Sequence, residues 1–378
     1  MRGLRKYLTP FAPDQSGAVS VLFELGGILV ICDAGGCTGN VCGFDEPRWF
    51  ERKSAVFSAG LRDMDAILGR DDRLVAKLAD AAGKLGTDVK FAAVIGTPVP
   101  AVIGTDYRAL KRMCEKKTDL PVLAVDANGM ELYDAGEEKA YLELFRVFAG
   151  KNGNKNNEES IYSTAEAKEV ERVGILGMTP QDMSDLNVSE RIKKLLWDNE
   201  KQKAVCYGMG DGLEEVRRAG TVSKNLVVSP AALKTAKYLE EMFGTPYEVT
   251  YPLAGELVPD MDYTGKKILI VHQQVIANSI REEIRRRCAE QGAETYESGE
   301  ADPEIQVAGW FMMKPELKEE KDIALRDEDD YISLVEQGEY DVIFADECMK
   351  CMTRGYHGIF VNTVHFAVSG KLAVTVHR

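Results

Sequence analysis

The stretch GILVICDAGGCTGNVCG, at residues 27–43, joins a short apolar run to a loop of glycines and cysteines. A short apolar run that ends in glycines is typical of a buried β-strand that opens into a loop. On open α/β sheets, ligands bind at the carboxyl ends of such strands. The stretch therefore predicts a core strand followed directly by a functional loop.

Three thiols in this loop, Cys32, Cys37 and Cys42, indicate a soft-metal site. Gly35 and Gly36 allow a tight turn beside Cys37, and we expect them to lie against the bound group. The Cys-x4-Cys-x4-Cys spacing is not that of a zinc finger, which favours shorter gaps, whereas iron–sulfur clusters tolerate varied spacings. A 4Fe-4S cluster takes four ligands, so the loop lacks one. The alternative is three buried or incidental thiols.

Strand-like and helical runs alternate along the whole chain. Strands are predicted at 27–31, 91–95, 121–125, 173–176, 204–207, 226–228, 268–271 and 342–345. Helix-length segments separate them, including a predicted helix over about 101–115, and this alternation is the signature of parallel βαβ units. The pattern predicts an α/β protein of three Rossmann-like domains with parallel sheets, at residues 1–155, 168–255 and 256–378. The polar run KNGNKNNEES at 151–160 marks the first boundary.

Composition limits the classes of partner. The 378 residues include 47 basic and 61 acidic side chains, for a net charge of −14. This balance argues against a nucleic acid or an anionic membrane as partner. The chain has no apolar run of membrane-spanning length and no signal-peptide core at its start, so we expect a cytoplasmic protein. In that compartment, its eight cysteines are better explained as metal ligands or ordinary thiols than as a disulfide framework.

A second cysteine pair, Cys348 and Cys351, follows the predicted strand at 342–345. A Cys-x-x-Cys at the start of a helix is open to three interpretations: a metal half-site, a redox dithiol, or no function. His357 and His365 lie just downstream and are candidate ligands, although a lone histidine is more often a structural hydrogen-bonding group.

Nucleotide-binding motifs are missing from the sequence. There is no G-x-x-x-x-G-K-S/T loop, so this chain should not itself hydrolyse ATP. The run GMGDG at 208–212 lacks the G-x-G-x-x-G spacing of a dinucleotide site, and we interpret it as a turn between a strand and a helix.

Four stretches, in order, resemble the nitrogenase component 1 family: AGGCTGN (34–40), SAVFSAGLRDMDAILG (54–69), GTPVPAVIGTDYRAL (96–110) and NLVVSPAALKTAKYLEEMFGTPY (225–247). The resemblance covers most of the chain. It implies three Rossmann-like domains, a homodimer or a heterodimer with a related subunit, and an iron–sulfur cluster near the dimer interface. It also implies oxidoreductase activity, with electrons delivered by an ATP-dependent iron-protein-like reductase.

The chain departs from the family at several positions. Cys37 falls on a cysteine that in nitrogenase subunits holds the interfacial cluster, but the family's other cysteines would fall near Phe11 and Pro98. The cysteine that holds the substrate-reducing cofactor would fall near Val228, while His365 lies near the place of its histidine ligand. We therefore expect no dinitrogen reduction, and a simpler cluster on local thiols.

The resemblance also gives Cys348 and Cys351 a metal-binding role. In a family fold, the loop after the third-domain strand faces the cleft between domains. The pair is therefore expected to supply an alternative metal anchor or a fourth ligand to the main cluster.

Three hypotheses follow. The leading one is a nitrogenase-like oxidoreductase with an iron–sulfur cluster on Cys32, Cys37 and Cys42, which receives electrons from a reductase docked near this loop and reduces a small molecule. The second is a non-catalytic scaffold for the assembly of an iron–sulfur or other metal cofactor. The third is a metal-free or zinc-binding protein that keeps only the fold.

Overall fold

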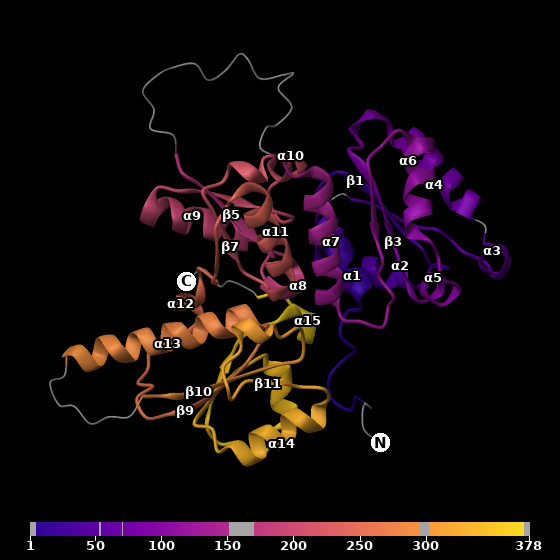
Figure 1. Cartoon of the computed structure of the whole chain (residues 1–378). Coiled ribbons are helices and arrows are strands. Elements are labelled where there is room, and N and C mark those ends of the chain that lie inside the picture. The colour runs from indigo at the N-terminus through magenta and orange to yellow at the C-terminus, as the bar shows by residue number, and fades with distance from the viewer. Residues whose placement is uncertain (1–4, 53, 70, 151–169, 295–301, 374–378) are drawn as a thin grey trace.

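The computed structural model describes residues 5–52, 54–69, 71–150, 170–294 and 302–373. Three separate parallel β-sheets, each flanked by helices, account for most of these residues (Figure 1). We call the parts of the chain built around them the first, second and third domains. The predicted fold class, α/β with several Rossmann-like parallel sheets, is confirmed. The first predicted boundary, at residues 151–167, lies outside the described residues.

The first domain contains a four-stranded sheet of order β2-β1-β3-β4. Its strands are β1 (Gly27–Ile31), β2 (Ala55–Ser58), β3 (Phe91–Ile95) and β4 (Val122–Val125). Its α-helices are α1 (Asp14–Leu22), α2 (Gly36–Asn40), α3 (Asp63–Leu68), α4 (Asp71–Leu85), α5 (Pro98–Ile103), α6 (Tyr107–Thr118) and α7 (Tyr133–Phe148). Every residue of β1 and β3 is buried, as expected for parallel strands covered on both faces. Short helical turns lie at η1 (Val41–Asp45), η2 (Pro47–Phe50) and η3 (Gly86–Asp88).

The second domain repeats this strand order as β6-β5-β7-β8. Its strands are β5 (Arg172–Leu176), β6 (Lys203–Cys206), β7 (Lys224–Val227) and β8 (Tyr247–Val249). Its helices are α8 (Pro180–Met183), α9 (Val188–Glu200), α10 (Leu213–Arg217), η4 (Ala219–Thr221), η5 (Pro230–Ala232), α11 (Leu233–Phe243) and α12 (Ala254–Leu257). The predicted turn at 208–212 lies between β6 and α10, where Asp211 accepts a hydrogen bond from the Cys206 N–H at 2.7 Å.

The third domain has five strands in the order β11-β10-β9-β12-β13. They are β9 (Lys267–Val271), β10 (Glu304–Gly309), β11 (Ile323–Ala324), β12 (Val342–Ala345) and β13 (Ile359–Asn362). Its helices are α13 (Gln274–Glu294), η6 (Pro315–Leu317), α14 (Glu328–Gly338), η7 (Glu347–Met352) and α15 (Phe366–Ser369). In each sheet the strand order reverses next to the first strand, at β1, β5 and β9, and such reversals are where α/β sheets bind ligands.

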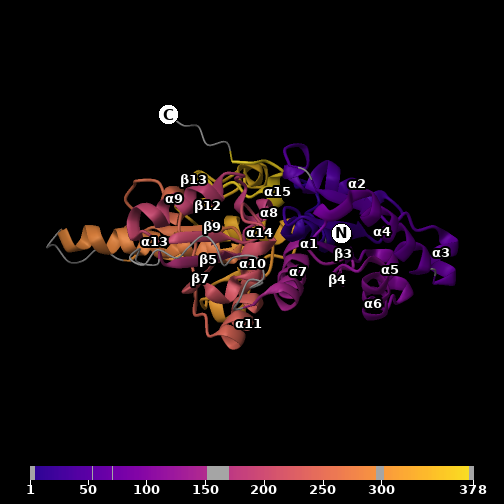
Figure 2. The ribbon, with the colours of Figure 1, turned by 90° about the horizontal axis from the view of Figure 1, so that it is seen from above.

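Helix α7 joins the first two domains. It packs closely against α1, because Gly136 lies on the carbonyl oxygen of Asp14 and Gly17 lies on that of Tyr133, where a Cβ would overlap. Its other side contacts α11 of the second domain (Figure 1). Seen from above, the first domain lies to one side, while the second and third overlap (Figure 2).

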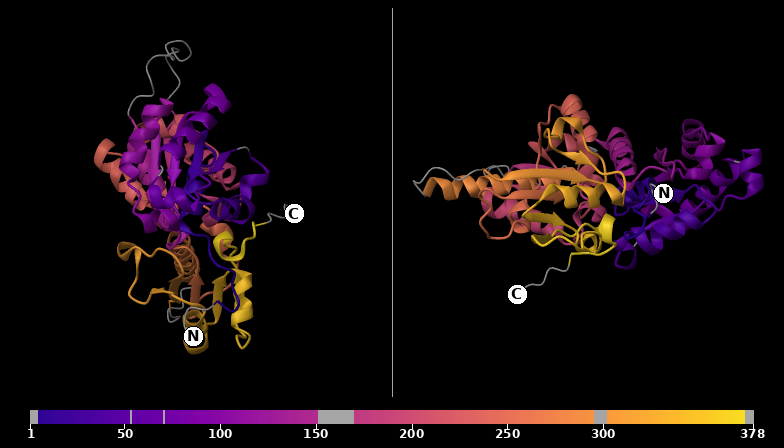
Figure 3. Two further views of the ribbon diagram at one scale, coloured as in Figure 1. Left: turned by 90° about the vertical axis from the view of Figure 1, so that its right-hand side faces the viewer. Right: turned by 90° about the horizontal axis from the view of Figure 1, so that it is seen from below.

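The N-terminal segment holds the first domain to the third. The Glu328 carboxylate, at the start of α14, accepts hydrogen bonds from the backbone N–H groups of Lys6 at 2.6 Å and Leu8 at 2.7 Å. Residues 6–8 accordingly lie against the third domain (Figure 3).

The helix predicted over about 101–115 is two helices instead. Gly104 has φ +68°, which ends α5, and Asp106 then begins α6 by accepting hydrogen bonds from the N–H groups of Arg108 and Ala109, both at 3.0 Å. Five further strands, β2, β8, β10, β11 and β13, were not predicted, because they are short or lack a continuous apolar run. None of the described helices is both long and apolar enough to span a lipid bilayer.

Candidate functional site

The cysteine loop forms a short helix at the carboxyl end of β1. After Ile31 the chain turns at Gly35, whose φ of +123° favours glycine, and continues through α2 into the π-helical η1. We call Gly36–Asp45 the cysteine helix. Ideal Cβ atoms built on Gly35, Gly36, Gly39 and Gly43 would meet no atom within 4 Å, so these positions face open space. There is room here for a bound group or a second chain.

Asp33 fixes the start of the cysteine helix. Its buried carboxylate accepts hydrogen bonds from Thr38 N at 2.7 Å, Thr38 Oγ1 at 2.9 Å and Ser58 Oγ at 2.6 Å. Thr97, after β3, donates to the Cys32 carbonyl at 2.7 Å. The loop is therefore held to the ends of both neighbouring strands. Asp33 is not among the site residues expected from the sequence, although an acidic residue directly after a strand and before a helix is a signal for this role.

The structure separates Cys32 from the other two thiols. Cys32 is 2% exposed and packs with Leu78 and Cys114 on one face of the first sheet, whereas Cys37 packs against the core on the opposite face. The two cores differ because side chains alternate between the faces of a strand. Within the described ranges, no group of three or more His, Cys, Asp or Glu side chains is placed to hold a metal ion. One chain thus does not bring Cys32, Cys37 and Cys42 together as a single ligand set.

Cys37 and Cys42 are the accessible thiols of the helix, since both are partly exposed. Partial burial and then the Asp33 carboxylate raise the pKa of Cys37, and burial, Asp33 and Glu46 raise that of Cys42. An acidic neighbour disfavours a free thiolate, whereas a bound cation would favour it. Both sulfurs are therefore accessible to a bound group, whereas Cys32 is buried.

Cys348 and Cys351 lie on η7, at the carboxyl edge of the third sheet. Cys348 is half-buried against the third domain's own core and Cys351 is exposed. Burial and then Asp346 raise the pKa of Cys348. His357 is exposed. Because the pair belongs to no group of three ligands among the described side chains, any metal there would need ligands from elsewhere.

His365 lies in a buried polar cluster where the three domains meet. Its Nε2 is 3.2 Å from the hydroxyl of Tyr133 on α7, which also hydrogen-bonds Asp182 on α8. The His272 ring, directly after β9, stacks on His365 with centroids 4.3 Å apart. We call Tyr133, Glu137, Asp182, His272 and His365 the three-domain junction.

The junction is closed to solvent, and this burial favours the neutral forms of Glu137 and His272. Burial and the Asp182 charge raise the pKa of Glu137 well above its usual value, and burial, then His365, lowers that of His272. One oxygen each of Glu137 and Asp182 has no hydrogen-bond partner among the described residues, and an internal water is the usual partner of such a buried group. Of this set, only His365 is a candidate from the sequence, because the members of the junction come from three domains.

A groove of about 440 Å³ lies between the first and third domains, beside the cysteine helix. It is lined by residues 9–13, by Asn40, Phe44 and Asp45, and by residues 366–370. Asp45 accepts a hydrogen bond from Ser16 Oγ at 2.7 Å, and burial raises the pKa of its carboxyl. A small molecule in this groove would contact the end of the cysteine helix and the Asp45 carboxyl.

Comparisons with known proteins agree with this architecture. Residues 15–256 match the family described as Nitrogenase component 1 type Oxidoreductase. The chain is 26% identical over 198 residues to the nitrogenase iron-molybdenum cofactor biosynthesis protein NifE of Klebsiella pneumoniae, and the match covers 50% of this chain and 41% of that protein. The chain thus matches less than half the length of this curated relative.

Two solved structures share the fold over nearly the whole chain. Nitrogenase Cp1 at pH 6.5 has a TM-score of 0.66 at 13% identity, covering 96% of this chain and 87% of the other. Nitrogenase Cp1 at pH 5 has a TM-score of 0.63 at 14% identity, covering 97% and 85%. At these identities the likeness concerns the fold alone.

Proposed function

Because the chain belongs to the nitrogenase component 1 type oxidoreductase family, we propose that it is the substrate-reducing component of a two-component redox system. In this scheme an ATP-dependent iron-protein-like reductase supplies electrons, and a small molecule is reduced in the groove between the first and third domains. The observation that carries the proposal is the cysteine helix, with two partly exposed thiols beside open space at the end of a switch-point strand.

We assign Cys37 and Cys42 as this chain's ligands to an iron–sulfur cluster of the 4Fe-4S type. Such a cluster would supply one-electron transfer. The remaining ligands would come from a second chain, identical or related, packed against the open face at Gly36, Gly39 and Gly43. Cys32 is not a ligand in this assignment, because its side chain is buried in the core on the other face of the sheet.

The protein's own residues would position the reaction. Asp33 holds the start of the cysteine helix rigid through Thr38 and Ser58. Asp45 lies at the opposite end of the same helix and lines the groove, so its carboxyl could donate a proton to a molecule bound there.

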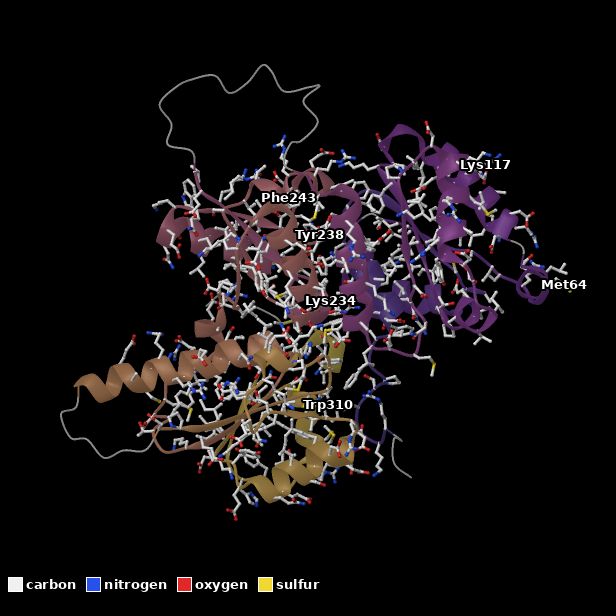
Figure 4. All side chains as sticks on the ribbon, in the orientation of Figure 1. Met64, Lys117, Lys234, Tyr238, Phe243 and Trp310 are labelled. Carbon is white, nitrogen blue, oxygen red and sulfur yellow. The ribbon has the colours of Figure 1, made fainter. Side chains whose placement is uncertain are left out.

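Exposed apolar side chains provide a docking surface for the reductase. Phe44 follows β1, Met64 and Leu68 follow β2, and Val102 follows β3, with exposed fractions of 77%, 58%, 59% and 87%. All four therefore lie at the carboxyl edge of the first sheet, with Met64 at the outer end of the domain (Figure 4). Large apolar side chains left in solvent at one edge are typical of a protein–protein contact. The run at 45–50 near the cysteine helix adds a second aromatic residue, Phe50, which is 83% exposed.

The test is anaerobic purification followed by iron and sulfide analysis and a turnover assay with a reductase. We expect iron and sulfide in the wild-type protein, and electron acceptance that depends on ATP. Reduction at equal rates with and without ATP would contradict the two-component scheme. Absence of both iron and sulfide after reconstitution would contradict the cluster.

The second candidate function is a scaffold for metal-cofactor assembly. It is favoured by the match to a protein named for iron-molybdenum cofactor biosynthesis. A scaffold would carry a cluster and transfer it to a recipient apoprotein without reducing a substrate. Transfer of iron and sulfide without turnover would support the scaffold over the oxidoreductase.

A further inference from the structure

The local backbone brings Cys348 and Cys351 together. Both lie on η7, a 3-10 helix over Glu347–Met352. In a 3-10 helix, residues i and i+3 eclipse one another, and a rise of about 2 Å per residue places their Cα atoms about 6 Å apart. Cα atoms joined by a disulfide are typically separated by about 4.4–6.8 Å. The two cysteines therefore have the spacing and the common face that a disulfide needs.

The turn is held in this conformation before any bond forms. The Asp346 carboxylate accepts a hydrogen bond from Cys348 N at 3.0 Å through one oxygen and from His365 N at 2.9 Å through the other. Residue 346 itself is buried. Closing the bond would require rotation of two short side chains and little backbone movement, which keeps the ordering cost low.

The two thiols differ in access. Cys351 is exposed, and its thiol donates a hydrogen bond to the carbonyl oxygen of Cys348 at 2.9 Å. Cys348 is half-buried against the third domain's core. This arrangement gives an outer thiol that a solution disulfide can reach and an inner thiol that can resolve the product.

A metal half-site explains the pair less well. A chelated ion needs three or four ligands, and among the described residues no group of three His, Cys, Asp or Glu side chains that includes this pair is placed to hold one. A disulfide needs only the two sulfurs.

We propose that Cys348 and Cys351 form a redox dithiol that exchanges disulfides with low-molecular-weight thiol compounds of the glutathione class. Cys351 loses its proton and its sulfur attacks one sulfur of oxidised glutathione, which forms a mixed disulfide and releases one glutathione, to which the proton goes. Cys348 then loses its proton and attacks Cys351 Sγ, releasing the second glutathione. In sum, two protein thiols and one oxidised glutathione become one protein disulfide and two reduced glutathione molecules.

The sequence provides a direct readout of this bond. Trypsin cleaves after Lys350, which lies between the two cysteines, and leaves them on separate peptides, residues 327–350 and 351–354. The full-length protein is equilibrated in glutathione buffers of increasing oxidised fraction, alkylated and digested. We expect the two peptides to appear joined, two hydrogen atoms lighter than their sum, and to separate on reduction. Absence of the joined peptide at every ratio would overturn the proposal.

Single variants test the order of attack. In Cys348→Ser the mixed disulfide should accumulate on Cys351, because the resolving thiol is gone. In Cys351→Ser the inner thiol should be modified at least about ten-fold more slowly, because it is half-buried. Equal modification of the two variants would overturn the assigned roles.

Two further measurements separate this site from its alternatives. The control Cys288→Ser, on α13, should give the joined peptide in wild-type yield. Metal analysis of the same preparations should show no difference between wild type and the Cys348→Ser, Cys351→Ser double variant. Loss of one equivalent of metal from the double variant would identify the pair as ligands and overturn the redox assignment.

Discussion

The cysteine helix and the three-domain junction both lie at carboxyl ends of switch-point strands, yet their surroundings are opposite. The helix has partly exposed thiols and glycines that face open space. The junction buries Tyr133, Glu137 and His365 to 1% exposure or less. The same position in an α/β sheet can therefore be either an open site or a packed core.

This difference indicates that the cysteine helix is the region for chemistry and that the junction holds the domains in position. An open face can accept a cluster, a second chain or a reductase, whereas the junction is closed to solvent and to other molecules. We expect changes in the cysteine helix to alter function with little effect on folding. Changes in the junction and in the contacts around it should alter stability first.

The largest expected effect is the loss of iron on Cys37→Ser. Removal of a ligand should reduce the cluster's retention at least as much as the roughly 10–100-fold loss caused by removing a supporting partner. The matched control is Cys32→Ala, which should keep its iron and lose about 1 kcal/mol or more of unfolding free energy, because Cys32 is a buried core side chain. Unchanged iron in Cys37→Ser, or its loss in Cys32→Ala, would reverse the assignment.

The second-largest effect is a loss of stability on replacement of Arg48, which follows the cysteine helix and connects it to the second domain. Its guanidinium is buried and bonds Glu46 at 2.7 Å, the Ser20 carbonyl at 2.6 Å and the Gly208 carbonyl at 3.1 Å. Arg48→Ala leaves the buried Glu46 carboxylate unpaired, so we expect a loss of about 3–5 kcal/mol in chemical denaturation.

Arg52→Ala is the control for Arg48, since both side chains pair with Glu24, at 3.0 and 3.1 Å, but Arg52 is 45% exposed. Its loss should cost about 0–1 kcal/mol. Equal losses of unfolding free energy in the two variants would show that burial does not determine how much these ion pairs contribute to stability.

Asp134, beside the junction, should make stability depend on pH. Burial raises the pKa of its carboxyl to about 6, so the folded protein holds the proton more tightly than the unfolded chain. The stability from this group is full below about pH 4 and is lost as pH rises through about 6. Relative to wild type, Asp134→Asn should therefore gain up to about 3 kcal/mol between pH 4 and pH 7.5. The exposed control Asp80→Asn should show no such gain. If the difference in unfolding free energy between Asp134→Asn and wild type does not change with pH, the prediction is contradicted.

The smallest effect on stability is expected at the docking surface. Val102→Ser removes an exposed side chain, so unfolding free energy should change by about 0.5 kcal/mol or less. Binding to the reductase or a second chain should weaken about ten-fold if Val102 is central to the contact. Met242→Ser, a 53% exposed residue of α11 on the second domain, should leave binding unchanged. Equal binding of wild type and Val102→Ser would move the docking site elsewhere.

Much of the fold was predictable because parallel strands covered on both faces are continuous apolar runs. The strands β1, β3, β5, β9 and β12 were all found in this way. Edge strands such as β2 and β13 are only partly buried, so their composition does not distinguish them from loops. The break between α5 and α6 depends on Gly104 and Asp106, two residues whose effect on a helix is local.

The sequence by itself determined the fold class, the repeated strand–helix units and the position of the cysteine loop after its strand, because these depend on neighbours along the chain. Only the tertiary structure decided that Cys32 is turned into a different core from Cys37. It alone brought Tyr133, Asp182 and His365, from three domains, into one buried cluster. The physical reason is that pleating and domain packing, rather than spacing in the sequence, decide which side chains share a volume.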